Sequence, residues 1–202
     1  MSVTIQIGRN DATRDVALVH AALTSPEQRT ALMKGIGLRA EREFRAWFRR
    51  RDAENPNKQG WPRQHFWTRR TMRPNYDPTK TTENSATIVV SDPAFAAKVY
   101  GATIRPTQGR KNLAIPLQAA VYGLQPHGNP VPGLFYIRKT DGNGGFLATR
   151  DQKSGPLTFW YRLLPEVTVP KDPQALPRTA DLGAALATTA QAFFRRHTSD
   201  HS

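Results

Sequence analysis

The chain contains no cysteine among its 202 residues. It can therefore form no disulfide, offers no thiolate nucleophile and has no cysteine-based zinc site, a pattern that fits a reducing compartment. It also lacks an apolar run long enough to cross a bilayer, which takes about 18 residues, and a basic start followed by an apolar stretch. We expect a soluble protein that no standard signal directs to secretion.

Acidic residues are few, and patterns typical of catalysis are absent. There are 16 Asp and Glu residues against 29 Lys and Arg, and the five histidines show no metal-ligand spacing. No Gly-x-Ser-x-Gly elbow or Walker loop occurs. A two-metal nuclease site would require acidic residues such as Asp92, Asp141 or Asp151 to converge through folding. We therefore predict no catalytic residue, no metal ligand and no cofactor, and keep a metal-dependent nuclease as a minor alternative.

The net charge of +13 is the strongest global feature of the sequence. It indicates a polyanionic neighbour, either nucleic acid or an acidic protein surface, although solubility alone is a second explanation. With 38% hydrophobic residues and 16 prolines, the chain can bury a sizeable core but should be rich in loops. A single domain is expected.

The N-terminal quarter predicts one strand and two helices. Residues 3–7 alternate apolar and polar side chains, as in a strand, and residues 11–23 have helical spacing. We interpret His20, within that apolar stripe, as a partly buried, hydrogen-bonded histidine rather than a ligand. Ser25 and Pro26 form a helix start with Gln28 placed to close a capping box, and the helix should reach about Asp52. Its apolar stripe comprises Leu32, Ile36, Ala40, Phe44, Trp47 and Phe48.

Arginines cover the rest of this helix and continue into residues 55–80, among aromatic side chains. Such a segment can hold nucleic acid through phosphate contacts and base stacking, or it can be an arm whose aromatics anchor on a neighbouring subunit. We favour an arm that becomes ordered on assembly, because long aperiodic loops are unusual inside compact domains. The basic residues that we predict to face DNA or an acidic partner are Arg49, Arg50, Arg51, Arg63, Arg69, Arg70 and Arg73.

From residue 86 the sequence has the period of strands. Residues 86–90, 157–164 and 167–169 read as strands, and 134–138 and 145–148 flank a hairpin turn at 141–144. A last helix is predicted from about Thr179 to His197. The fold class is α+β: a long N-terminal basic helix and a C-terminal helix packed on a small, mainly antiparallel β-sheet, with an extended arm. The segments of the domain are 1–54, 55–85, 86–177 and 178–202.

Residues 97–117 organise the rest of the chain. Two short apolar strands flank the polar, basic segment 107–112. Gly101 permits a turn or a close backbone approach, and Pro106 and Pro116 belong at strand ends or edges, where another chain can pair. The predicted subunit interface is Trp61, Phe66, Trp67, Tyr100, Gly101, Ile104, Pro106, Leu113, Ile115 and Pro116.

A family resemblance appears in this stretch. Tyr100-Gly101-Ala102-Thr103-Ile104-Arg105-Pro106, followed by Leu113-Ala114-Ile115-Pro116-Leu117, resembles the central pattern of the tailed-phage virion-morphogenesis (tail-completion or head–tail joining) proteins. Upstream, Gly60-Trp61-Pro62 is similar to the family's Gly-Trp-x-Pro-Leu element. Two departures stand out: Lys98 and Val99 occupy the place of an expected His, and Ala102 replaces a second Gly.

The resemblance implies a structural virion protein rather than an enzyme. It implies a ring of six copies around the DNA path at the head–tail junction, assembled in the host cytoplasm and contacting the connector, the tail terminator or the tail tube. In such a ring the edges near Gly101–Leu117 would pair with neighbouring copies. The alternative is a stand-alone basic nucleic-acid-binding protein.

Overall fold

The structure is a computed structural model, and it describes residues 12–54, 60–61, 65–127, 131–140, 142–151 and 154–199. It confirms the α+β class, with a long N-terminal helix, a C-terminal helix and small antiparallel sheets. Of the described helices, none combines the length and apolar character needed to cross a membrane.

The chain divides into two compact units where the sequence suggested one domain. The helical unit comprises the described parts of Met1–Arg49, Arg70–Ser91 and Leu176–Ser202, and the sheet unit those of Arg50–Arg69 and Asp92–Ala175. The chain passes between the units after Arg49, Arg69, Ser91 and Ala175. The expectation of a single domain stays a prediction.

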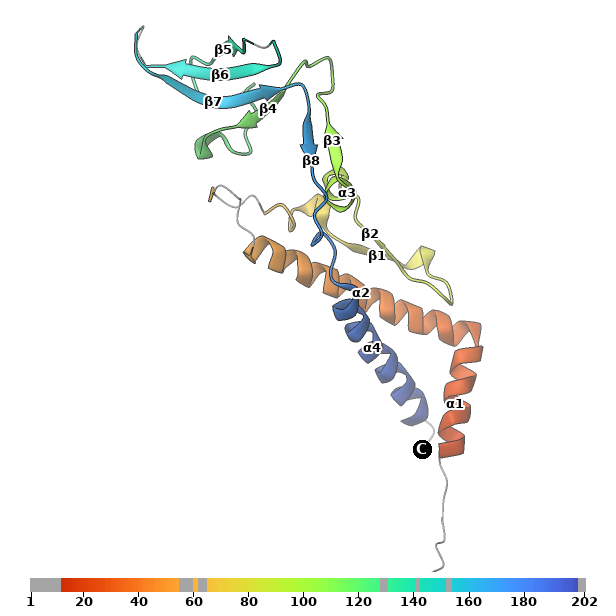
Figure 1. Ribbon diagram of the computed structural model, residues 1–202. Helices are drawn as coiled ribbons and strands as arrows, with labels where there is room; N and C mark the ends of the chain where they lie inside the picture. The colour runs from red at the N-terminus through yellow and green to blue at the C-terminus, as the bar shows by residue number, and fades with distance from the viewer. Residues whose placement is uncertain are drawn as a thin grey trace, which may run out of the picture. The chain divides into compact units, whose positions relative to one another are not determined.

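The helical unit contains three long helices and one small sheet. The helices are α1 (Ala12–Thr24), α2 (Pro26–Glu54, which continues into the sheet unit) and α4 (Thr179–Ser199). Helices α1 and α4 pack together (Figure 1). Strands β1 (Asn75–Asp77) and β2 (Thr87–Val89) form an antiparallel pair, and the 3-10 turns η1 (Arg70–Met72) and η2 (Pro78–Lys80) flank β1. The predicted strand at 3–7 lies outside the described residues.

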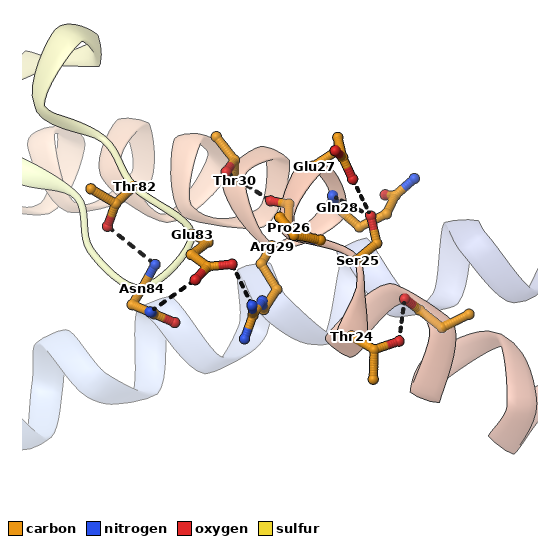
Figure 2. Close-up of polar contacts among 11 residues, drawn as sticks. Thr24, Ser25, Pro26, Glu27, Gln28, Arg29, Thr30, Thr82, Glu83 and Asn84 are labelled. Carbon is orange, nitrogen blue, oxygen red and sulfur yellow. Dashed lines mark hydrogen bonds and ion pairs between the residues drawn. The ribbon is translucent and has the colours of Figure 1, made fainter.

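Local sequence explains where α2 begins. The Oγ of Ser25 accepts a hydrogen bond from the backbone N–H of Gln28 at 3.3 Å, which confirms Ser25 as the N-cap (Figure 2). Its hydroxyl donates to Glu27 at 2.8 Å. Two hydrogen bonds to the Glu27 carboxylate lower its pKa: one from the backbone N–H of Glu27 itself and this one from Ser25. An ion pair between Arg29 and Glu83 ties the first turn to the loop before β2 (Figure 2).

The apolar stripe predicted for α2 is confirmed. Leu32, Ala40 and Phe48 are buried, and the other members of the stripe are half-buried. The prediction for α1 was wrong at His20, whose side chain is exposed. Helix α1 forms as the apolar spacing predicted. Its apolar stripe is not buried, however, because Val16 and Leu23 are also exposed.

The segment 55–85 is not an extended arm in its described part. Tyr76 in β1 is buried, and its ring lies so close over Gly37 of α2 that a Cβ there would overlap it. The backbone N–H of Tyr76 donates to Glu41 at 3.1 Å, and its hydroxyl bonds Thr81 at 2.6 Å. The glycine gives the ring room to settle on the helix, and so this part of the segment folds within its own chain.

The sheet unit contains helix α3 (Pro93–Tyr100), the 3-10 turn η3 (Ala119–Val121) and six strands. The strands are β3 (Ala102–Ile104), β4 (Leu113–Pro116), β5 (Phe135–Arg138), β6 (Gly145–Arg150), β7 (Leu157–Leu164) and β8 (Val167–Val169). They form an antiparallel pair, β3–β8, and a four-stranded antiparallel sheet in the order β4-β7-β6-β5 (Figure 1). The prediction of antiparallel pairing is confirmed, but the strands are divided among separate small sheets.

The β5–β6 hairpin forms where the glycines predicted it. Gly142 and Gly144 have φ of 75° and 80°, in the left-handed region that glycine enters without strain. A Cβ on Gly144 would overlap the carbonyl oxygen of Leu163 in β7. The core beside this sheet contains Val121 and Tyr161, both wholly buried. The loop that contains η3 therefore covers part of the sheet.

Candidate assembly edges and basic surfaces

The motif at 100–117 supplies two edge strands, as the prolines predicted. β3 pairs with β8 through Ala102↔Val169 and Ile104↔Val167, and β4 pairs with β7. In the described part of the chain neither strand has a second neighbour, so each has one open edge. The sequence could not show that β3 and β4 join different sheets, because a six-residue polar segment permits either arrangement.

Gly101 permits a close approach within the chain itself. Its φ is 78°, and a Cβ there would lie 3.3 Å from the backbone nitrogen of Lys171 and 3.4 Å from the carbonyl oxygen of Val169. The neighbouring apolar side chains remain accessible: Tyr100 is 81% exposed and Ile104 is 42% exposed. Of the predicted interface residues, these two are the most open to a neighbour.

The second half of the motif is more enclosed. Leu113, Ile115 and Pro116 of β4 are half-buried, and so is Pro106 after β3. Pro116 lies opposite Tyr161, and the next residue continues the ladder when the N–H of Leu117 donates to the carbonyl of Trp160 at 2.8 Å. These side chains pack within the sheet unit. The part of β4 that stays open to a neighbouring subunit is its backbone edge.

The three aromatic residues predicted as arm anchors contact their own sheet unit. The ring of Trp61 meets Tyr122 edge-on at 5.3 Å, and Phe66 meets Trp67 at 5.1 Å. Trp67 is buried, with the Arg51 guanidinium 5.1 Å from its ring centroid. Trp67 is therefore a core residue of this unit and leaves the proposed interface, whereas Trp61 and Phe66 are half-buried and stay in it.

Arg51 and Arg69 bond carboxylates of their own unit rather than standing free for DNA. Arg51 is buried and donates to Asp172 at 2.6 Å and Gln174 at 2.7 Å. Arg69 donates to Asp92 at 2.6 Å. A buried guanidinium needs such partners, because an unpaired charge in the interior is very costly. Arg51 therefore acts as a structural cross-link.

The other predicted basic residues are divided between the two units. Arg49, Arg70 and Arg73 are exposed on the helical unit, and Arg50 is exposed on the sheet unit. Arg63 lies outside the described residues. The four exposed arginines remain candidates for contact with a polyanion.

A further basic surface lies on the sheet unit, at the polar segment between the two halves of the motif. Two hollows open there. The loop hollow, of about 540 Å³, has polar lining residues Arg105, Thr107, Arg110, Asn112, Gln125 and His127. The hairpin hollow, of about 690 Å³, has polar lining residues Lys111, Asn112, Tyr136, Arg138 and Asn143. No described carboxylate lines either hollow. In the sequence, the signal for this basic surface was the pair Arg110-Lys111, which directly follows Gly109.

The acidic residues considered for a nuclease have other surroundings where they are described. Asp92 caps α3 by accepting from the backbone N–H of Ala94 at 2.8 Å, and it also pairs with Arg69. Asp141 lies outside the described residues. Within the described ranges, no group of three His, Asp or Glu side chains is placed to hold a metal ion.

Comparisons with protein-family models, with curated proteins and with solved structures each gave no match to this chain. The likeness to the tailed-phage virion-morphogenesis proteins therefore rests on residues 60–62 and 100–117.

Proposed function

We propose that this chain is a structural protein of a tailed-phage virion, a tail-completion or neck component that assembles as a six-membered ring around the DNA path at the head–tail junction. The observation that carries the proposal is the pair of open strand edges at β3 and β4, within the motif that resembles that family. Tyr100 and Ile104 stand exposed beside the first of these edges.

The open edges suit assembly for a physical reason. An unpaired strand presents a row of N–H and C=O groups that a second chain can satisfy by adding a strand. β3 and β4 are short, three and four residues, so their edges alone offer little affinity. Exposed apolar side chains beside the edge supply the apolar area that a specific interface needs. Repeating one head-to-tail contact closes into a ring when the rotation permits it.

The basic charge suits the partners of such a ring. The exposed Arg49, Arg50, Arg70 and Arg73 would meet passing DNA or an acidic face of the connector, the terminator or the tail tube. Phosphate contacts carry no base information, so the ring would let DNA of any sequence pass. In this proposal the chain needs no catalytic group and no cofactor.

The proposal is tested by the mass of the purified protein in solution, alone and with isolated tails, at low and high salt. We expect a discrete ring, either free or formed on tails. The variant Tyr100→Asp/Ile104→Asp should remain monomeric, because it places two charges beside the open edge. Val16→Asp/Leu38→Asp is the matched control, since both are exposed apolar residues of the helical unit, and it should assemble normally. A monomer under every condition contradicts the proposal.

The second candidate is a stand-alone nucleic-acid-binding protein, and the two basic hollows favour it. It predicts a monomer that binds duplex DNA tightly at low salt, releases it at high salt and never assembles. The same mass measurement, repeated with duplex DNA, separates the two candidates.

A further inference from the structure

We propose that the loop hollow and the hairpin hollow together form the surface that holds the phosphate backbone of duplex DNA. We name this the loop–hairpin surface and define it by Arg110, Lys111, Asn112, Arg138 and Asn143. The inference rests on the proposed DNA path, and it assigns the principal DNA contact to residues that differ from all the arginines predicted from the sequence.

The two hollows are adjacent. Asn112 and Leu163 line both of them, so the start of β4 and the end of β7 form their shared wall. Arg110 lines one hollow, and Lys111, the next residue, lines the other. The segment before β4 thus supplies one cation to each hollow, and the two hollows form one continuous surface that meets at Asn112.

The cations of this surface are available to a ligand. Arg110, Lys111 and Arg138 are exposed, and no ion pair joins them to a carboxylate of a described residue. Arg105, at the edge of the loop hollow, differs because it pairs with Glu166 at 2.9 Å. Since charges already neutralised by a carboxylate contribute little to binding a polyanion, Arg110, Lys111 and Arg138 are the residues that matter.

Arg138 lies beside the glycine turn of the hairpin. A Cβ on Gly142 would lie 3.7 Å from the Nη2 of Arg138, so the guanidinium lies beside the glycine turn. Tyr136, two residues earlier on β5, donates from its hydroxyl to the carbonyl of Gly144 at 2.9 Å. The Tyr136 bond ties the turn to β5, and Arg138 lines the hairpin hollow beside that turn.

The composition of the surface favours a phosphodiester backbone over an acidic protein. Its defining side chains are cations and amides, which are the side chains that contact DNA phosphates most often. The hollows also have apolar lining residues, such as Leu124 and Leu163, so the exposed cations rather than the lining as a whole carry the argument for a phosphodiester. With a net charge of +13, the whole chain also attracts a polyanion over long range. Contacts to phosphate carry no base information, so we expect binding without sequence preference.

The test measures the affinity of the full-length protein for a labelled blunt duplex as a function of salt. The test variant is Arg110→Gln/Lys111→Gln/Arg138→Gln. The matched control is Lys34→Gln/Arg42→Gln/Arg196→Gln, which removes the same charge from exposed basic residues of the helical unit that neither proposal places at DNA. We expect the test variant to bind at least about tenfold more weakly and to flatten the slope of log K against log salt by about 2.7, which is about 0.9 for each phosphate that the protein no longer neutralises. The control should keep the wild-type slope.

Several results would overturn the inference. Equal reductions of affinity in both variants would make binding a property of net charge, and a reduction in the control alone would place the DNA-binding surface on the helical unit. Binding of polyglutamate by a wild-type protein that does not bind the duplex would mean that the surface docks an acidic protein. Circular dichroism of each variant checks that its fold is intact.

The same samples distinguish failure of this inference from failure of the proposed function. A ring that forms normally while the test variant binds DNA like wild type would sink the inference and leave the virion proposal standing. A chain that never assembles, but whose loop–hairpin surface carries the salt dependence, would leave the inference standing for a stand-alone DNA-binding protein.

Discussion

The loop–hairpin surface uses basic side chains differently from the ion-paired arginines found in both units. In the helical unit several arginines bond carboxylates of the same unit, through the pairs Arg29–Glu83, Arg39–Glu43 and Arg45–Glu41. In the sheet unit Arg51 and Arg69 do the same with Asp172 and Asp92. On the loop–hairpin surface of that unit, three cations instead stand beside hollows that no described carboxylate lines.

This contrast separates the arginines that stabilise the fold from those that can meet a ligand. The net charge of +13 counts both kinds alike. A paired guanidinium has already exchanged part of its hydration for a carboxylate, so it adds little to the attraction of DNA. The contrast therefore predicts large effects on stability from one group of arginines and large effects on binding from the other.

The largest effect is expected from Arg51→Met. Removing the guanidinium leaves Asp172 without its partner in a mostly enclosed position and should lower the free energy of unfolding by about 3 kcal/mol. Arg110→Met, at an exposed arginine of the loop–hairpin surface, should change it by less than about 0.5 kcal/mol. Urea unfolding measures both. The double variant Arg51→Met/Asp172→Asn should recover part of the stability, and no recovery would mean that packing rather than charge is responsible.

Local sequence patterns predicted the long helices and the β5–β6 hairpin but not the partners of these arginines. Ser25 and Pro26 mark the start of α2, and Gly142 and Gly144 mark the hairpin turn, because each acts through residues within one turn of itself. Arg51 bonds a carboxylate 121 residues away. No local period reveals such a pairing, and so Arg51 looked like any other arginine of a basic helix.

The candidate site was also predicted only in part. Proline and glycine spacing placed strand edges at 102–104 and 113–116, and the structure has edge strands there. The sequence also suggested a free aromatic arm, whereas Tyr76 lies on Gly37 of α2. That contact depends on a glycine in α2 and a tyrosine ring in β1. Sequence spacing cannot show it, because the two residues meet only in the folded structure.

A middle-sized effect is expected from Gly144→Ala, which tests whether the close packing of the hairpin turn on β7 requires a residue without a side chain. The new methyl group would meet the carbonyl oxygen of Leu163 at a backbone φ of 80°, so we expect the stability to fall by about 2–3 kcal/mol. Gly109→Ala is the matched control, because Gly109 has φ of 72° but open space around it, and its stability should fall by only about 1 kcal/mol. Thermal unfolding compares the two. Equal reductions would show that backbone strain alone, without the clash, sets the effect.

The smallest effect concerns a carboxylate of the helical unit. A hydrogen bond from the Thr79 hydroxyl, at 2.6 Å, is the main cause that lowers the pKa of Asp77 below its ordinary value of 3.8. A group whose pKa is lower in the folded state stabilises the protein above its unfolded value, and that contribution disappears as the pH falls through the folded value. The advantage of wild type over Asp77→Asn in urea unfolding should therefore be present at neutral pH and shrink below pH 3.8. Thr79→Val, which removes the donor hydroxyl, should show a weaker pH dependence than wild type. If both proteins become less stable with acid in parallel, other carboxylates dominate and this bond contributes nothing measurable.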